Sequence, residues 1–419
     1  MKFVLCAALL LCSTAALAAP ASDRAIDRAT QARIDRILKR TPLIDGHNDI
    51  AEQLLEDHKY SVANLASGTD KWPANPLMTD MARLRAGRVG GQFWSVYING
   101  NLKGDEAIRK TIEQIDVVDR MIAAYPNDLA RALTADDIVR IHKSGKIASL
   151  IGIEGGHQIG GSPSALRQYY RLGARYMTLA HFSNSEIADS ATDDPEHNGL
   201  STFGQSVVRE MNRIGMLVDL AHVSPKAMAD ALATSKVPVL FTHSDARALT
   251  DNPRNVPDEI LLRVRSNGGV VMVNFYTGHL SEPYRQWNAS RAAEKARQGL
   301  LLNGQPDARA IAMKVWDTAN PEPTAEPGLV ADHIDHIAKV AGHDHVGIGA
   351  DMDGIDATPV GLEGVDGYPL LFAELIRRGW SDANLAKLAG GNVLRALRAA
   401  ETYARAHASD APAPETLPK

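Results

Sequence analysis

Short apolar runs rich in β-branched residues alternate with longer amphipathic stretches along nearly the whole 419-residue chain. This alternation is typical of a parallel sheet whose strands are joined by crossover helices. Helices are predicted between the runs, as at residues 105–124, 163–172, 201–214, 224–234 and 257–266, and several open with Ser, Asp or Pro. The runs themselves predict eight strands, at residues 42–46, 89–98, 148–153, 175–180, 216–221, 237–242, 269–275 and 345–350.

Eight strand–helix pairs predict an α/β fold with a single (β/α)8 TIM-type barrel. An open doubly wound sheet is the alternative, but no Gly-rich phosphate-binding sequence follows the first strand. Residues 279–326 interrupt the alternation with a Lys- and Arg-rich helical segment at 290–302 and then a loop with Gly, Pro and Asn. We predict an insertion after the seventh strand, on the active-site face of the barrel. It would be either a lid or pocket wall, or a solvated excursion without a role.

The two ends of the chain differ from the predicted domain at residues 19–405. Residues 1–18 have a basic Lys2, an apolar run at 3–11 and a small-residue cleavage site ending at Ala18, so we predict a signal peptide. Export would then deliver the protein to the periplasm or outside the cell. The apolar run is too short to span a bilayer, so no integral membrane anchor is expected. Residues 406–419 are rich in Ala, Pro and acidic residues and predict a flexible tail.

Composition narrows the chemistry that the domain can use. Both cysteines, Cys6 and Cys12, lie within the predicted signal peptide, so the mature chain would have neither a disulfide nor a thiol nucleophile. A formal net charge of −5 provides no basic field for nucleic acid. With 45% hydrophobic and 23% charged residues, the chain has the composition of a globular protein with a large core.

Polar side chains gather where the predicted strands end. The carboxyl ends of barrel strands form the face on which active sites lie. Burying so many ionisable groups together would be very costly without a metal. The residues that follow strands one, three, four, five, six and eight are His47 and Asp49, Glu154, His181, His222, His243 and Asp351.

These residue types predict two metal ions. His47 and Asp49 are two residues apart on an extended segment, so both side chains point to the same side. The imidazoles of His222 and His243 suit zinc, and the Glu154 carboxylate could bridge two ions. Three histidines and two carboxylates exceed the three protein ligands of one catalytic zinc.

Two zinc ions about 3.5–4 Å apart can share a water and lower its pKa to about 7, which makes a hydroxide available to attack an amide. Hydrolysis then needs a group that stabilises the oxyanion and a proton carrier for the leaving amine. His181 and Asp351 are the candidates for these roles.

Most of the 14 histidines are interpreted as structural. His333 and His336 lie on a predicted helix, and His343 and His345 precede the eighth strand at the opposite rim. His157 follows Glu154 by three residues, and we favour packing around the site or in a loop over direct ligation.

The motifs around these residues resemble the membrane dipeptidase family, also called renal dipeptidase, of the metal-dependent amidohydrolase superfamily, in an exported bacterial form. The resemblance runs from about residue 42 to residue 398. It is carried in order by residues 44–49 (IDGHND), 91–95 (GQFWS), 154–156 (EGG), 176–181 (YMTLAH), 219–222 (DLAH), 242–244 (THS), 254–257 (RNVP) and 349–354 (GADMDG).

The resemblance implies a role for each residue. One zinc would be bound by His47 and Asp49 and the other by His222 and His243, with Glu154 bridging both. It also implies dipeptide substrates, with a D-residue possible at the second position, and a possible homodimer. His181 would stabilise the tetrahedral intermediate, Arg254 would bind the C-terminal carboxylate, and Asp351 would contact the amino group and carry a proton to the leaving amine.

Two other functions compete with this interpretation. One is another two-metal amidohydrolase that acts on a lactone, phosphoester or cyclic amide, and the other is a non-catalytic exported zinc-binding protein. Arg254 argues against the first, because a guanidinium pairs bidentately with a carboxylate that lies one residue from the scissile bond only in a dipeptide. Intact His181 and Asp351 argue against the second, because a storage site needs no acid–base groups.

Overall fold

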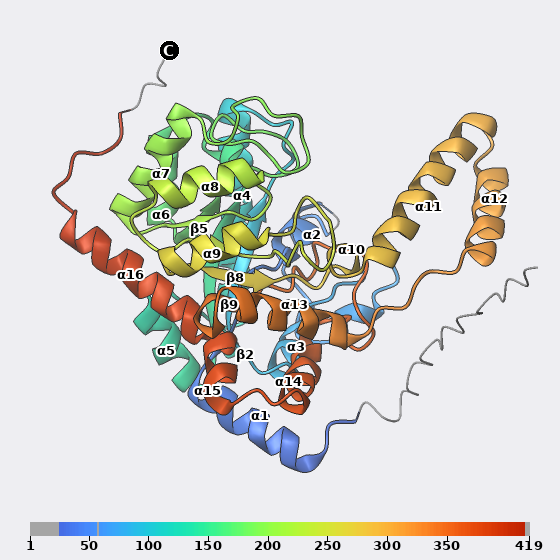
Figure 1. Ribbon diagram of the computed structural model, residues 1–419, viewed down its shortest axis with the longest axis horizontal. Helices are drawn as coiled ribbons and strands as arrows, with labels where there is room; N and C mark the ends of the chain where they lie inside the picture. Colours follow the sequence, from blue (N-terminus) through green and yellow to red (C-terminus); the bar gives the residue numbers. More distant parts are fainter. Residues whose placement is uncertain (1–24, 57, 415–419) are drawn as a thin grey trace, which may run out of the picture.

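Eight parallel strands close into a barrel in the computed structural model, which describes residues 25–56 and 58–414 (Figure 1). The ring closes because β2 pairs with β1 on one side and β4 on the other, while β9 pairs with β1. The predicted barrel is therefore confirmed, and the open sheet is wrong. The strands around the ring are β1 (Leu43–Asp45), β2 (Val89–Tyr97), β4 (Ile147–Glu154), β5 (Ala174–Thr178), β6 (Leu217–Asp219), β7 (Leu240–Phe241), β8 (Val270–Val273) and β9 (Val346–Ile348).

One further strand was not predicted. β3 (Leu129–Arg131) pairs with the first residues of β4 and lies beside the ring. Its sequence, Leu-Ala-Arg, is not part of an apolar, β-branched run of the kind that predicts the other strands.

Both faces of the barrel strands are buried, which explains why the strands read as continuous apolar runs. On β8, Val270 and Met272 pack with one hydrophobic cluster, and Val271 and Val273 pack with another. The first cluster also holds Phe93 and side chains from five other strands. Successive side chains therefore alternate between two packed layers, as the period of two in a strand requires.

Helices surround the barrel, and their N-terminal caps match the sequence signals. Ser201 and Ser224 accept hydrogen bonds from the third residue beyond them, which satisfies a backbone N–H at the start of the next helix. The helices are α1 (Arg28–Arg40), α2 (Ile50–Glu56), α3 (Met81–Ala86), α4 (Gly104–Ala124), α5 (Ala135–Lys143), α6 (Pro163–Arg171), α7 (Thr202–Ile214), α8 (Pro225–Thr234), α9 (Asp258–Asn267), α10 (Thr277–Leu280), α11 (Glu282–Leu301), α12 (Pro306–Ala319), α13 (Pro327–Val340), α14 (Tyr368–Arg377), α15 (Asp382–Ala386) and α16 (Asn392–Ala406).

The segment predicted as an insertion forms two long helices that stand away from the barrel as a hairpin (Figure 1). The helix predicted at 290–302 is present as α11 but starts earlier, at Glu282. The prediction of a loop after that helix is wrong from residue 306 on, because α12 begins there. Pro306 opens that helix at a first-turn position, where the missing N–H costs nothing. The hairpin is joined by a bidentate ion pair, with Arg291 Nε and Nη2 2.7 and 3.0 Å from the Asp317 carboxylate.

The ends of the chain are only partly described. The predicted signal peptide at residues 1–18 lies outside the described residues, and the predicted tail is described only as far as residue 414. α16 ends at Ala406, the first residue of that tail. Within the described part of the chain, no helix is long and apolar enough to cross a membrane.

Candidate metal centre

Glu154 is the centre of a buried group of histidines at the carboxyl end of the barrel. It is the last residue of β4, so its position on the strand directs the side chain into the mouth of the ring. His222 Nε2 and His243 Nε2 lie 3.1 and 3.3 Å from Glu154 Oε1, and His47 Nε2 lies 3.4 Å from Oε2. His181 Nε2 is also 3.5 Å from Oε1. One carboxylate therefore faces imidazoles on both of its oxygens.

The predicted donors all converge, in three overlapping groups whose ligand atoms lie within 4.8 Å of one another. Two groups share Glu154, which is the arrangement of a binuclear centre. His181 and Asp351 join the five predicted ligands in these groups, and His47 belongs to two of them. The groups are His47, Glu154 and His243; Glu154, His181 and His222; and His47, Asp49 and Asp351.

The residues present fit two divalent ions. His47 Nε2 and Asp49 Oδ1 are buried and have no hydrogen-bond partner among residues 25–56 and 58–414. The Nε2 atoms of His222 and His243 face each other at 2.8 Å, and both face the same carboxylate oxygen. Nitrogen and carboxylate donors that converge on buried points without satisfying one another are the donors that zinc and related ions use.

Electrostatics favour the metal-binding protonation states of Glu154, His222 and His243. For His47, by contrast, burial opposes the charge, but Tyr176, Glu154 and Asp49 outweigh that effect and raise the pKa of His47 well above its usual value. Burial opposes the charge on Glu154, but the surrounding imidazoles, chiefly His47 and His181, outweigh it and hold the pKa of Glu154 well below its usual range. Burial lowers the pKa of His222 and His243 well below the usual value, so both rings stay neutral. An ionised carboxylate and neutral imidazoles are the forms that bind metal.

Two buried aspartates behind the ligands tie neighbouring strands together. Asp45, on β1, accepts hydrogen bonds from His47 N, Ala350 N and Tyr368 Oη at 3.2, 2.9 and 2.5 Å. Asp45 thereby fixes the segments that carry His47 and Asp351 relative to each other.

Asp219, on β6, accepts from Thr178 Oγ1 at 2.5 Å and from Thr242 Oγ1 and N at 2.8 Å. Thr242 Oγ1 in turn lies 3.0 Å from His243 Nδ1. Such partners behind a ligand orient its ring toward the metal.

Tyr176 supports the other side of the centre. Its hydroxyl lies 3.0 Å from His47 Nδ1, which leaves Nε2 of the same ring to face Glu154. The Tyr176 ring comes from β5 and occupies the space beside Gly152, where an added Cβ would lie only 1.9 Å from it. A side chain at position 152 would therefore displace the tyrosine that orients His47.

Two of the strand-end residues have a strained backbone. His222 and Asp351 have φ angles of +67° and +65°, in the left-handed region that non-glycine residues rarely adopt. Asp351 Oδ2 accepts a hydrogen bond from Asn274 Nδ2 at 2.9 Å, and its Oδ1 lies 3.9 Å from His47 Nε2. Such strain clusters at functional sites, where surrounding contacts hold it in place.

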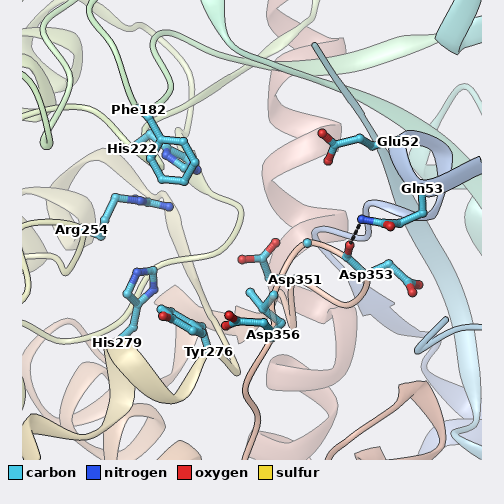
Figure 2. A pocket seen from close by; sticks show the side chains of 12 residues that line it. Glu52, Gln53, Phe182, His222, Arg254, Tyr276, His279, Asp351, Asp353 and Asp356 are labelled. Atoms are coloured by element: carbon cyan, nitrogen blue, oxygen red, sulfur yellow. Dashed lines mark hydrogen bonds between the residues drawn. The ribbon is translucent and has the colours of Figure 1, made fainter. Parts of the chain in front are cut away.

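A cavity of about 540 Å³ opens beside the metal centre (Figure 2). Arg254 lines it and is only 3% exposed, and its Nη1 has no hydrogen-bond partner in the described part of the chain. Burial lowers the pKa of Arg254 to about 10, which still leaves the group charged at neutral pH. No residue of α11 or α12 lines this cavity; the lining residues are Glu52, Gln53, Phe182, His222, Arg254, Tyr276, His279, Asp351, Asp353, Gly354, Ile355 and Asp356.

The histidines interpreted as structural belong to none of the three donor groups. His157 is buried with its Nε2 3.2 Å from the Ile98 carbonyl oxygen. His333 and His336 lie on α13, and His345 Nδ1 is 2.8 Å from the Gly269 carbonyl oxygen.

Comparison with known proteins identifies the family. The sequence model of the membrane dipeptidase family, peptidase family M19, matches residues 31–411 of this chain. The chain belongs to this family. It is 42% identical over 383 residues to an uncharacterised dipeptidase of Schizosaccharomyces pombe, with 87% of this chain and 82% of that protein covered. It is 39% identical over 377 residues to the dipeptidase verJ of Clonostachys rogersoniana, with 87% and 86% covered.

A solved structure agrees with the fold. The probable dipeptidase PvdM from Pseudomonas aeruginosa has a TM-score of 0.76 and 25% identity, with 90% of this chain and 100% of that chain covered. The protein is thus a metallopeptidase of the membrane dipeptidase type, with a metal centre around Glu154. The two curated relatives are fungal, so the similarity does not single out a bacterial form.

Several residues of the site were not predicted. Asp45 and Asp219 carried a signal, since a carboxylate within an apolar strand needs a buried partner. Asn274 carried none, because its hydrogen bond to Asp351 joins positions 77 residues apart in the chain.

Proposed function

We propose that this protein is an exported two-zinc dipeptidase that hydrolyses the peptide bond of dipeptides with a free C-terminal carboxylate. The observation that supports it most is a buried and charged guanidinium, that of Arg254, in the same cavity as His222 and Asp351; its Nη1 has no hydrogen-bond partner among the described residues. A buried cation with an unsatisfied donor is costly, and a substrate carboxylate would satisfy it.

The protein groups divide the work on such a substrate. Arg254 holds the C-terminal carboxylate through a bidentate pair, which sets the position of the peptide bond. His181 is buried beside Glu154 and His222, where it stabilises the oxyanion that forms as the carbonyl is attacked. Asp351 contacts the amino group and passes a proton to the leaving amine. Burial raises the pKa of Asp351 well above its usual value, so its carboxyl group can hold that proton.

The ions would be held by His47 and Asp49 on one side and by His222 and His243 on the other, with Glu154 bridging. When bound, they supply Lewis acidity and lower the pKa of water to about 7. We propose zinc because imidazole and carboxylate donors suit it, although the same donors also accept neighbouring transition metals. Metal analysis of the purified protein tests both the number of ions and their identity.

Three further features belong to the proposal. Recognition through the carboxylate does not itself fix the configuration of the second residue, so we include D-residues there. Export rests on the signal-peptide pattern at residues 1–18. A homodimer through the hairpin is supported by its exposed apolar side chains, because such patches mark protein–protein contacts. These are Leu300 at 85%, Leu301 at 63%, Ile311 at 67% and Val315 at 66% exposure.

Arg254→Ala tests the dipeptidase proposal directly. Loss of a charge-assisted pair should lower kcat/KM for dipeptides about 10- to 150-fold, mainly through KM, with metal content unchanged. Arg247→Ala is the matched control, since Arg247 lies on the same loop but pairs with Asp251 at 2.9 Å on the surface.

The wild-type protein should cleave L-Ala-L-Ala and L-Ala-D-Ala but not tripeptides or lactones. Cleavage of lactones but not of dipeptides would favour the other amidohydrolase function. Two bound metal ions with no hydrolysis of any substrate would favour a non-catalytic zinc-binding protein.

A further inference from the structure

The wall of the cavity around Arg254 is built from two segments that are joined by asparagine side chains. Asn255 Nδ2 donates to the carbonyl oxygen of His279 at 2.8 Å, and Asn252 Nδ2 donates to that of Gly278 at 3.1 Å. Asn252 Oδ1 also accepts from the Arg254 backbone N–H at 2.9 Å. The loop between β7 and α9 is thereby fixed against α10, and Arg254 is placed beside His279.

His279 has a buried ring nitrogen that the described residues leave without a hydrogen-bond partner. The side chain lines the same cavity as Arg254 (Figure 2) and is 9% exposed, and the unsatisfied atom is Nδ1. The neighbouring Tyr276 ring packs edge-on against the imidazole with 5.0 Å between ring centroids, which restrains its orientation. Leaving such a buried atom without a hydrogen bond is unfavourable, so native proteins keep few of them.

Arg254 shows the same deficiency on the same wall, where Nη1 has no hydrogen-bond partner within the part of the chain that the structure describes. Two unsatisfied nitrogen atoms, on residues that come from different segments and line one cavity, indicate a ligand with at least two acceptor atoms. A carboxylate has two oxygens and a negative charge that complements the guanidinium.

The charge state of His279 fits a donor rather than a second cation. Burial, and then the nearby Arg254 charge, lower the pKa of His279 well below its usual value. The ring is therefore neutral at physiological pH and carries one N–H. A neutral imidazole can donate to an anion without adding the cost of a second buried charge.

We propose that His279 donates a hydrogen bond from Nδ1 to the substrate's C-terminal carboxylate and, together with Arg254, selects a free carboxylate over an uncharged C-terminus. This inference rests on the proposed dipeptidase function. It makes His279 a specificity-determining residue, and it assigns a role to the first residue of the segment predicted as an insertion.

The test compares L-Ala-L-Ala with its C-terminal amide in wild type, His279→Ala and His279→Asn. The Ala variant should lose about 10- to 100-fold in kcat/KM on the free dipeptide, through KM, and should lose part of the preference over the amide. Asparagine can place its Nδ2 near the position of Nδ1, so it should restore most of the loss. His345→Ala, at the opposite rim, is the control and should change neither quantity.

The results separate this inference from the function on which it rests. An unchanged preference for the free dipeptide in His279→Ala would overturn the inference, as would equal losses of kcat in the Ala and Asn variants. Failure of the metal-loaded wild type to cleave any dipeptide would overturn the proposed function as well.

Discussion

Gly354 lies against the carboxylates of Asp49 and Asp351, which occupy the space that a side chain at this position would need. A Cβ at this position would lie 2.2 Å from Asp49 Oδ2 and 2.7 Å from Asp351 Oδ1. Real Cβ atoms essentially never approach another heavy atom closer than 3.0 Å. Gly354→Ala must therefore push the Asp49 carboxylate away by about 1 Å, or shift its own backbone by as much. The φ angle of Gly354 is not positive, so alanine adds no backbone strain there.

Displacement on this scale should be severe for catalysis and mild for folding. A misplacement of about 1 Å costs on the order of 100-fold in rate, and a disturbed ligand shell weakens metal affinity about 10- to 100-fold. We expect kcat/KM for L-Ala-L-Ala to fall about 100-fold and one of the two metal ions to be lost on dialysis. The free energy of unfolding should change by less than about 1 kcal/mol, because Gly354 is exposed to the cavity.

The control is Gly100→Ala, because Gly100 has no heavy atom within 4 Å of its ideal Cβ and no positive φ. Activity is measured on the dipeptide, metal content by mass spectrometry and stability by urea unfolding. Full activity with two retained ions in Gly354→Ala would refute the placement of Asp49 as a ligand in this centre. An equal loss of stability and activity would show that the substitution disturbs the fold instead.

Three other predictions follow from supporting contacts. Tyr176→Phe removes the hydroxyl behind His47 and should weaken metal affinity about 10- to 100-fold in competition with a chelator, with no change in substrate KM. Tyr368→Phe leaves Asp45 without its 2.5 Å donor and should lower the free energy of unfolding in urea by about 1–3 kcal/mol. Burial lowers the pKa of His333 from its ordinary 6.5 to about 4, so the unfolded chain takes up the proton first as the pH falls. Because of His333, the free energy of unfolding should fall by about 1.4 kcal/mol for each unit by which the pH drops between 6.5 and 4. In His333→Gln the free energy of unfolding should fall less steeply over the same range.

The barrel and its donors could be predicted from sequence because both depend on local pattern. Each barrel strand is a short apolar run, and the closed sheet follows from their number and order. The donors follow the runs directly, and parallel strands bring their carboxyl ends to one rim. Glu154 and His243, for example, lie within two residues of a strand end and meet across the ring. The roles of these residues stay predictions, because proximity alone does not assign them.

The hairpin and the supporting contacts could not be read in the same way. Gly304 precedes α12 and Pro306 is its first residue, and both residue types usually indicate a turn. Only in the first turn of a helix is proline a helix-start signal instead. Asp45 bonds Tyr368 across 323 residues, and Asn274 bonds Asp351 across 77. Such partners are set by tertiary packing, for which the sequence offers no periodic signal.

The ligand rim and the cavity wall differ in how they are held, and this difference bears on which of them can vary. Buried carboxylates that bond several strands at once hold the rim: Asp45 joins β1 to the segment after β9, and Asp219 joins β5, β6 and β7. A change there disturbs several ligands together. Side-chain amides that bond loop carbonyls hold the wall around Arg254 and His279, and these contacts leave the barrel untouched. Substrate preference can therefore change through the wall while the metal centre stays intact, so His279 variants should alter specificity and Tyr176 variants should alter metal binding.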